Sequence, residues 1–310
     1  MKKRILITGA SGFIGQALLK FIDTRRLSFD LCAVALHPQK SQVPILKCDF
    51  LQEKKVFQLL SSTTPDYIIH LVGGRRLKKE DMFESNFMTT QILFDSIQKL
   101  RGYKPRVLIP GTAAEYGSWQ KAGLVKEETR CHPASWYGFV KYMQTSLGLM
   151  YARGGLDIVV ARMFNILGSG VPVTLAIGKF AQEIVKIEQK IVPAVLETRN
   201  LDGKRDFLDI DDVCYGLLMI AQHGKKGEIY NLCSSRAYVI RQLLQKLFSY
   251  SAVKNIEIKE EKEKFSDSYD VIGSNAKIKR IFNWKPRVSV EESLKKSLEY
   301  YRDRLKETVD

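Results

Sequence analysis

The sequence has 310 residues, 45% of them hydrophobic and 27% charged, which is typical of a globular protein with one large or two modest domains. It contains no run of about 18 apolar residues, so a membrane span is not expected. The five cysteines are scattered, and neither they nor the four histidines show metal-ligand spacing. A disulfide framework and a metal site are therefore not expected, and a reducing, cytoplasmic location is expected. The net charge of +15 is compatible with nucleic-acid binding or with an anionic small substrate, and it does not separate the two because the basic residues form no long tract.

Apolar strands and amphipathic helices alternate through the first half of the chain. Strands are predicted at 4–8, 31–36, 43–49, 66–72, 106–112 and 157–165. Helices are predicted between them at 12–22, 53–62, 82–100 and 135–153. Because the strands are almost continuously apolar, they indicate a parallel sheet covered by helices on both faces. The expected fold class is α/β, with a Rossmann-type doubly wound parallel sheet.

The alternation loosens after residue 166. Helices are predicted at 174–190, 237–250 and 289–305, and a strand at the segment IYNL, residues 229–232. Three aspartates, Asp209, Asp211 and Asp212, precede an apolar helical segment and are predicted to cap a helix rather than to bind a metal. We expect a first domain over residues 1–165 and a smaller substrate-binding lobe over residues 166–310, with some exchange of chain between them.

A glycine-rich turn, TGASGFIG at residues 8–15, follows the first strand and opens the first helix. Backbone N–H groups in such a turn can approach a pyrophosphate closely, and the positive end of the helix dipole favours its negative charge. The strand before the turn and the helix after it are the context that makes a dinucleotide site a sound prediction. The residues expected to contact the cofactor here are Gly9, Ser11, Gly12, Phe13, Ile14 and Gly15.

The adenosine end of the cofactor is expected near the second and third strands. An acidic residue after the second strand would bind the ribose hydroxyls of NAD, but the segment AVALHPQK has none. His37 and Lys40 are available instead to meet a 2′-phosphate, so NADP is favoured and NAD stays open. Asp49 and Phe50, after the third strand, are placed to contact the adenine.

The segment SWYGFVKY, residues 135–142, places Tyr137 and Lys141 four residues apart, on one face of a helix. A ketone that accepts a hydride also needs a proton for its oxygen, and a tyrosine with a pKa of about 10 relays protons poorly near neutral pH. A neighbouring ammonium would favour the phenolate and lower that pKa. The spacing alone is equally compatible with two unrelated residues on a helix surface.

Taken in order, the motifs resemble those of the extended short-chain dehydrogenase/reductases, also described as the NAD-dependent epimerase/dehydratase family. The resemblance covers nearly the whole chain, and its second half is most similar to nucleotide-sugar 4-keto-reductases of the GDP-4-keto-6-deoxy-mannose type. UDP-glucose 4-epimerases and nucleotide-sugar 4,6-dehydratases share the scaffold. The motifs that carry the resemblance are TGxxGxxG, HLVG (70–73), Asn86, GTAAEYG (111–117), YxxxK (137–141), RMFNILG (162–168), RNLDGKRDFLDIDDV (199–213), GEIYNLCSS (227–235) and FNWKP (282–286).

This resemblance implies roles for individual residues. Tyr137 would act as the acid, Lys141 would bind the nicotinamide ribose, and Thr112 would donate a hydrogen bond to the substrate oxygen. Leu71, Val72, Gly73 and Asn86 would lie near the nicotinamide. The second lobe would bind a nucleotide diphosphate sugar, with Arg205 opposite the diphosphate. The further substrate contacts that the resemblance suggests are Asn165, Arg199, Lys264 and Glu115.

Three departures from the family pattern narrow the expected activity. Thr112 stands where serine is expected, and HLVGG replaces HLAA near the nicotinamide. Ala113 and Ala114 replace the acidic pair of the dehydratases, and Ala114 also replaces the cysteine of the epimerase-reductase.

The expected function is NAD(P)-dependent reduction of a nucleotide-linked 4-keto-6-deoxyhexose to the 6-deoxyhexose. A 4-epimerase with tightly bound NAD is the near alternative, and a non-catalytic relative that binds RNA or protein is the remote one. By resemblance we expect a homodimer formed through the helix at 135–153 and the helix before it, with neither a membrane nor a nucleic acid as partner.

Overall fold

The computed structural model describes residues 2–39, 41–75, 78–117, 123–261 and 270–306, so the predictions for Lys40 and Lys264 lie outside the described residues. Its centre is a seven-stranded sheet with the order β11-β6-β5-β4-β1-β2-β3, in which every pairing is parallel. The strands are β1 (Lys3–Thr8), β2 (Phe29–Ala35), β3 (Ile45–Lys47), β4 (Tyr67–His70), β5 (Arg106–Thr112), β6 (Asp157–Met163) and β11 (Ile229–Leu232).

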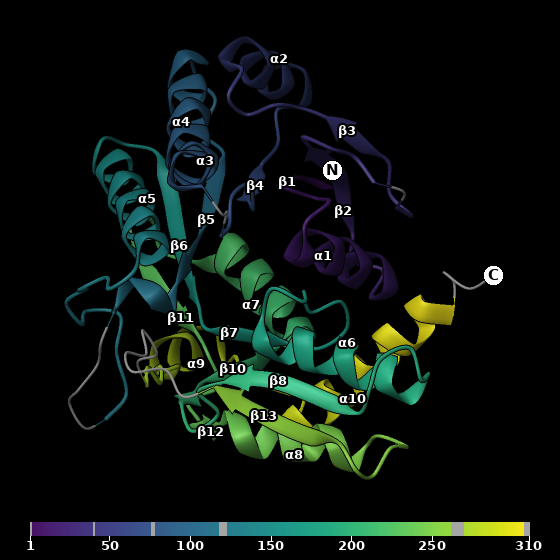
Figure 1. Ribbon diagram of the computed structural model, residues 1–310. Helices are drawn as coiled ribbons and strands as arrows, with labels where there is room; N and C mark the ends of the chain where they lie inside the picture. The colour runs from purple at the N-terminus through teal and green to yellow at the C-terminus, as the bar shows by residue number, and fades with distance from the viewer. Residues whose placement is uncertain (1, 40, 76–77, 118–122, 262–269, 307–310) are drawn as a thin grey trace.

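Helices cover both faces of this sheet, which confirms the expected doubly wound α/β fold (Figure 1). One face packs against α2 (Glu53–Thr63), α4 (Thr89–Lys99) and α5 (Trp136–Arg153). The other packs against α1 (Phe13–Thr24) and α7 (Ile210–His223). Apolar side chains alternate between these two cores along each strand; in β1, for example, Leu6 faces one core while Ile5 and Ile7 face the other.

The long helix predicted at 82–100 is interrupted. It begins as α3 (Lys79–Phe83), passes through a single π-helical turn, η1 (Glu84–Met88), and continues as α4. A π-turn inserts one residue per turn and therefore rotates the side chains that follow it relative to those before. The interruption is centred on Asn86, which the sequence placed near the nicotinamide.

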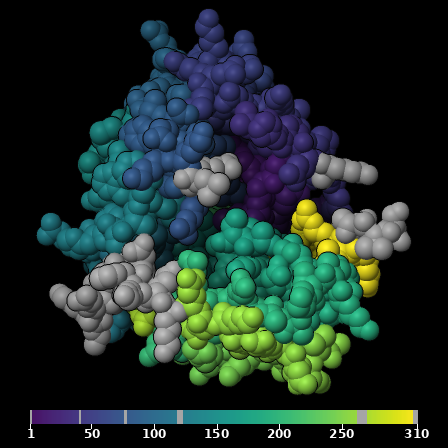
Figure 2. All heavy atoms as spheres, in the orientation of Figure 1, coloured from purple at the N-terminus to yellow at the C-terminus, as the bar shows by residue number. Residues whose placement is uncertain are grey.

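The second lobe is built on α6 (Ala176–Glu188), α8 (Ile240–Ser249) and α10 (Val290–Lys306), which share one apolar core. Short strand pairs lie beside these helices, while β11 returns to the main sheet after the expected boundary at 165. Figure 2 shows a hollow between the blue and purple N-terminal part and the teal and green second lobe. The pairs are β7 (Asn165–Leu167) with β10 (Phe207–Asp209), β9 (Lys204–Arg205) with β12 (Tyr238–Val239), and β8 (Val195–Arg199) with β13 (Glu257–Glu261); α9 (Ala276–Phe282) follows.

The aspartates at 209–212 act at the start of α7, as predicted. Asp209 is the N-cap, and its carboxylate accepts hydrogen bonds from the Asp211 backbone N–H at 2.8 Å and the Ser293 hydroxyl at 2.6 Å. Asp212 accepts from two backbone N–H groups of the segment before α10. Among the described residues no three metal-ligating side chains come together, and no helix there is long and apolar enough to cross a bilayer.

Candidate active site

The glycine-rich turn has the geometry that a bound pyrophosphate needs. Gly9 has φ +64°, and a Cβ there would lie 2.5 Å from the Leu71 carbonyl oxygen, so the turn and the end of β4 touch backbone to backbone. A Cβ on Gly15 would lie 2.5 Å from the carbonyl oxygen of Gly9. No side chain caps α1 at Gly12, so the first N–H groups of the helix are left for a ligand. The residues present therefore fit a dinucleotide.

Phe13 and Ile14 follow the turn, and their side chains pack into the protein rather than toward solvent. Phe13 contacts the core clusters of both lobes, which ties the start of α1 to the second lobe. Ile14 packs in the cluster between α1 and α7. Their backbone groups lie in the first turn of α1, and any contact that they make with a pyrophosphate would come from these groups.

At the predicted adenosine end, the Ser11 hydroxyl donates to the carbonyl oxygen of His37 at 2.8 Å, which joins the glycine turn to the end of β2. His37 is exposed. Asp49 accepts hydrogen bonds from the Leu51 N–H and the Gln52 side chain before α2. Phe50 is 3% exposed and its ring packs 5.3 Å from the His70 ring, so the expected contact of this ring with adenine finds no support.

Thr112 ends β5 and begins the short 3₁₀ helix η2 (Ala113–Glu115). Its hydroxyl accepts from the Ala114 N–H at 3.3 Å, and Glu115 returns a carboxylate oxygen to the Thr112 N–H at 2.7 Å. This capping box fixes the backbone of the threonine. The second carboxylate oxygen of Glu115 accepts two bonds from Arg162, at 2.8 and 3.0 Å.

Glu115 is therefore placed differently from its expected role. Its side chain is fully buried, and both carboxylate oxygens are bonded within the protein. The expected contact with a sugar hydroxyl finds no support in this geometry. Glu115 instead fixes the backbone of Thr112 by accepting a hydrogen bond from its N–H, and it carries a negative charge close to the site. Sequence reasoning missed its partner Arg162, which lies 47 positions away on β6.

Tyr137 and Lys141 lie on one face of α5, beside Thr112. Ser135 is the N-cap of the helix, and its hydroxyl accepts a hydrogen bond from the Gly138 N–H at 3.1 Å. A Cβ at Gly138 would lie 2.4 Å from the Ala114 carbonyl oxygen, so glycine lets the first turn of α5 approach η2. This approach brings the Tyr137 phenol within hydrogen-bonding reach of the Thr112 hydroxyl. The structure thus places Thr112 beside Tyr137, and Lys141 follows one turn further along α5.

The pKa values of Tyr137 and Lys141 are both shifted, and that of Tyr137 moves in the direction opposite to the one expected. Burial raises the pKa of Tyr137 to about 12; the Glu115 charge adds to that shift, while the Thr112 hydrogen bond and the Arg75 charge oppose it. Burial also lowers the pKa of Lys141 to about 8. In the protein alone the pKa of Tyr137 thus moves opposite to the direction that its spacing from Lys141 suggested. At neutral pH the tyrosine is a phenol, ready to donate a proton.

The loop after β4 lies over the same edge of the sheet. Gly73 and Gly74 have φ of +120° and +127°, and Asn86 clamps them by accepting from the Gly74 N–H and donating to its carbonyl oxygen, both at 2.9 Å. A Cβ at Gly73 would lie 2.4 Å from the Asn86 amide oxygen. Asn86 thus holds the loop that carries Arg75. Contacts of Asn86, Leu71, Val72 and Gly73 with a cofactor remain predictions.

On the substrate side, the pairing of β7 with β10 brings Asn165 close to the Arg205–Asp206 segment. The Asn165 side chain donates to the Asp206 carbonyl oxygen at 3.0 Å, and the Arg205 guanidinium lies 3.3 Å from Asp270. The Asp206 carboxylate is fully buried and accepts from Ser234 at 2.7 and 2.8 Å. Burial raises the pKa of Asp206 to about 6. Asp206, which sequence reasoning passed over, anchors this corner of the lobe.

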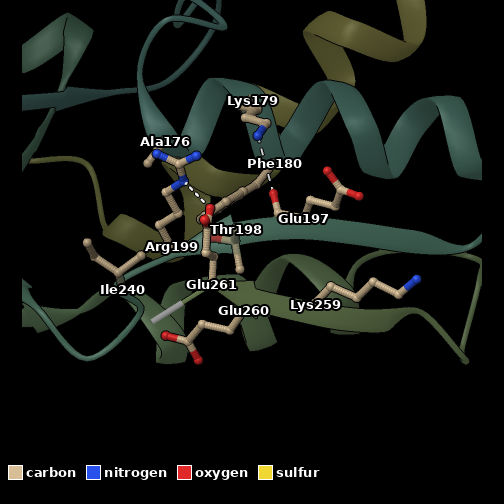
Figure 3. Close-up of a pocket in the computed structure, with 10 residues that line it drawn as sticks. All are labelled: Ala176, Lys179, Phe180, Glu197, Thr198, Arg199, Ile240, Lys259, Glu260 and Glu261. Atoms are coloured by element: carbon tan, nitrogen blue, oxygen red, sulfur yellow. Dashed lines mark hydrogen bonds and ion pairs between the residues drawn. The ribbon is translucent and has the colours of Figure 1, made fainter. Parts of the chain in front are cut away.

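Arg199 lies apart from that pair, on a cavity of about 760 Å³ between α6, β8 and β13 (Figure 3). Its guanidinium is exposed and pairs with Glu261 at 2.8 Å. Lys179 on α6 and Lys259 on β13 add two more cations to the lining, and Phe180 adds an aromatic ring. The lining also contains three carboxylates, those of Glu197, Glu260 and Glu261. Sequence patterns do not indicate this cavity, because four separate segments line it: α6, β8, β13 and Ile240 at the start of α8.

Comparisons with known proteins match nearly the whole length of this chain in both sequence and structure. GDP-6-deoxy-D-mannose reductase from Pseudomonas aeruginosa is 29% identical over 316 aligned positions, which cover 99% of this chain and 100% of the relative. GDP-6-deoxy-D-talose 4-dehydrogenase from Aggregatibacter actinomycetemcomitans is 27% identical and covers 98% and 99%. The solved structure of RMD from Pseudomonas aeruginosa complexed with NADPH superimposes with a TM-score of 0.86, at 28% identity and coverage of 98% and 100%.

UDP-glucose 4-epimerase from Thermotoga maritima, solved with UDP-glucose, has the same TM-score of 0.86 at 22% identity and covers 97% of this chain and 99% of its own, which shows the shared fold. The family model described as the NAD dependent epimerase/dehydratase family matches residues 5–233. The glycine turn, the Thr112–Tyr137–Lys141 group and these matches agree with one another. The chain belongs to the NAD-dependent epimerase/dehydratase family.

Proposed function

We propose that the protein is an NADPH-dependent reductase of a nucleotide-linked 4-keto-6-deoxyhexose. The observation that carries this proposal is the Thr112–Tyr137–Lys141 group, in a chain that aligns end to end with a GDP-6-deoxy-D-mannose reductase. The missing acidic residue after β2 and the NADPH in the structure of the Pseudomonas aeruginosa relative support NADP over NAD.

The chemistry follows from the protonation states. When bound, the nicotinamide supplies the hydride to the keto carbon. The Tyr137 phenol gives its proton to the oxygen that becomes the product hydroxyl, and its raised pKa keeps that proton in place until the oxygen becomes basic. The Thr112 hydroxyl can donate to the same oxygen as its charge develops. Lys141 supplies a positive charge beside the phenolate that remains.

We place the substrate across the hollow between the two lobes, with the sugar at Tyr137. Arg205 and Asn165 face the diphosphate, since a guanidinium offers paired donors to phosphate oxygens. Arg199 and the cavity of Figure 3 take the nucleoside. A cavity of this size has room for a nucleoside, and its mixed lining of three cations, three carboxylates and one aromatic ring offers hydrogen-bonding groups and a stacking surface.

The decisive experiment is NADPH oxidation with GDP-, UDP- and dTDP-linked 4-keto-6-deoxyhexoses, followed by identification of the sugar product. We expect turnover with one of the three nucleotides, loss of that turnover in Tyr137→Phe, and weaker turnover with NADH. Two outcomes would contradict the proposal. NAD that survives gel filtration, together with epimerisation of UDP-glucose, would show an epimerase. Strong salt-dependent RNA binding without turnover would show a non-catalytic relative.

We also propose that the enzyme is a homodimer that pairs through α5 and its neighbour α4. Four large apolar side chains of α5 are 39–51% exposed, which is unusual on a monomer surface. The exposed residues are Trp136, Phe139, Tyr142 and Met150. Light scattering should give twice the mass of one chain, and a charged substitution at Phe139 should shift the measured mass toward that of the monomer.

The proposed cytoplasmic location rests on the five cysteines, all of them free thiols.

A further inference from the structure

Lys141 sits at the end of a buried chain of hydrogen bonds that its sequence motif does not include. Its ammonium donates to the side-chain oxygen of Gln144, one turn further along α5. The Gln144 amide donates to the Thr90 hydroxyl at 2.7 Å, and that hydroxyl donates to the Asn86 carbonyl oxygen at 2.6 Å. Lys141 is 3% exposed, and Gln144 and Thr90 are fully buried. The chain therefore joins the catalytic helix α5 to α4 and the π-turn before it.

The direction of these bonds limits what the chain can do. Every donor points the same way, from Lys141 through Gln144 and Thr90 to a backbone carbonyl. A carboxamide cannot pass a proton along unless it tautomerises, so the chain fixes a position and does not conduct protons. An ammonium has three donors, and the bond to Gln144 uses one of them. Within the described residues no protein acceptor is found for the other two donors, so they remain for a ligand.

The charged and titratable groups around Lys141 leave Gln144 as its nearby acceptor. From β4, His70 faces it; burial and the lysine charge lower the pKa of His70 to about 3, so His70 is neutral at working pH. From η2, the Glu115 charge acts on the ammonium, but both of its oxygens are bonded elsewhere. From α5 itself comes Tyr137, a phenol at neutral pH.

We propose that Gln144 is a positioning residue that holds the Lys141 ammonium at the cofactor end of the site, anchored through Thr90 to α4. This inference rests on the proposed function, which makes Lys141 part of the catalytic group. An unheld lysine side chain has several rotamers, and a displacement of about 1 Å at a reacting group can cost on the order of 100-fold in rate. A buried acceptor at Gln144 removes that freedom before the cofactor binds.

Two substitutions at this position separate positioning from simple packing. Gln144→Met keeps the volume and removes the acceptor, so kcat should fall about 10- to 100-fold. The alkaline limb of the kcat/KM profile should then move to lower pH, because a hydrogen bond to the charged form has been lost. Gln144→Glu keeps an acceptor and adds a negative charge, so the same limb should move up by about one unit or more. A packing role cannot move the limb in opposite directions.

Matched controls come from the same two helices. Thr145 is 2% exposed, lies next to Gln144 in the chain, and its buried hydroxyl has no hydrogen-bond partner within the described residues. Thr145→Val should therefore leave the rate and the pH profile unchanged. Thr90→Val cuts the anchor and should reproduce part of the Gln144→Met effect, while Thr90→Ser should restore it.

NADPH affinity gives a readout that does not need the sugar. NADPH titration by fluorescence should show weaker binding in Gln144→Met and not in Thr145→Val. If wild type binds NADPH but reduces none of the keto-sugars, the proposed function fails while this difference can still appear. Equal affinities in wild type and Gln144→Met, or limbs that shift the same way in both Gln144 variants, would overturn the positioning role.

Discussion

The buried ion pair beneath Thr112 makes a sharp prediction about stability. Arg162 is 2% exposed and Glu115 is fully buried, and the guanidinium gives two hydrogen bonds to one carboxylate oxygen. In Arg162→Leu the carboxylate would stay buried without its countercharge. Removing one partner of a buried pair costs about 3–5 kcal/mol, because the remaining charge is neither paired nor hydrated. We expect the free energy of unfolding to fall by that amount.

Removing both charges should cost less than removing one. Glu115→Gln keeps an oxygen that can accept from the Thr112 N–H, so the capping box survives. The combination of Glu115→Gln with Arg162→Leu leaves no buried charge, and it should recover about 1–3 kcal/mol relative to Arg162→Leu alone. Both Arg162→Leu proteins also lose the stacking of the guanidinium on Tyr116, whose ring centre lies 4.6 Å away, so this loss cancels in the comparison.

The assay is urea unfolding, extrapolated linearly to water, with the wild type and the three variants at one pH. Arg106→Leu is the matched control: Arg106 pairs with Asp157 at 3.0 Å on the neighbouring strand, but the two side chains are 21% and 31% exposed. A partly hydrated pair contributes about 1 kcal/mol or less. If Arg162→Leu costs no more than Arg106→Leu, or if the double variant is the least stable of the set, the burial argument is refuted.

The remaining predictions concern the catalytic group, the cofactor turn and the substrate. Tyr137→Phe should lower kcat about 10²- to 10⁴-fold with NADPH affinity unchanged, measured by steady-state kinetics and titration. Lys141→Met should be inactive, yet its free energy of unfolding in urea at pH 7 should be up to about 3 kcal/mol higher than that of the wild type. The reason is that the pKa of Lys141 drops from 10.5 to about 8 on folding, so the charged lysine destabilises the folded protein at neutral pH. This gain in stability should vanish as the pH rises from 8 to 10.5. Gly9→Ala should abolish NADPH binding, since the alanine Cβ would collide with the Leu71 carbonyl. Arg205→Ala should raise KM for the nucleotide sugar more than it lowers kcat, as measured by initial rates.

The sequence predicts the main sheet well because its signals there are local. Each buried strand is a short apolar run, and each covering helix has an apolar stripe, so neither needs knowledge of distant residues. The same holds for the glycine turn and for Tyr137 with Lys141, because strand–turn–helix order and helical spacing are written in consecutive residues. Gln144 could have been found in the same way, since it lies three positions after Lys141 on the same helix.

The second lobe was less predictable because its strands form through distant pairing. The strand β13, with the sequence EIKEE, carries no apolar alternation and has a composition poor in strand formers. It pairs with β8, about 60 positions away, and the ion pair from Arg199 to Glu261 joins the two strands, while the ion pair from Arg241 to Glu260 joins β13 to α8. A pattern read along the chain cannot show such a pairing, nor the cavity beside it.

The protonation of the site is the clearest case of information absent from the motif. Spacing places an ammonium near a phenol and suggests a lowered pKa for the phenol. Burial acts on both groups in the opposite sense, because it disfavours phenolate and ammonium alike, and the charge of Glu115 reinforces this at Tyr137. The raised pKa of Tyr137 and the lowered pKa of Lys141 therefore share one main cause, burial, which the spacing of the two residues does not show.

The raised pKa of Tyr137 suits a reductase. Before hydride transfer the phenol keeps its proton at neutral pH, so Tyr137 is not available as a base to remove a proton from the substrate. Once the substrate oxygen takes the proton, the phenolate that forms is stabilised by groups that are already in place, the Thr112 hydroxyl and the Arg75 charge. The buried ammonium costs folding free energy at neutral pH, and its hydrogen bond to Gln144 offsets part of that cost. A site that holds a buried ammonium at the expense of stability should lose activity when it recovers stability, and the inactive but more stable Lys141→Met protein tests this trade directly.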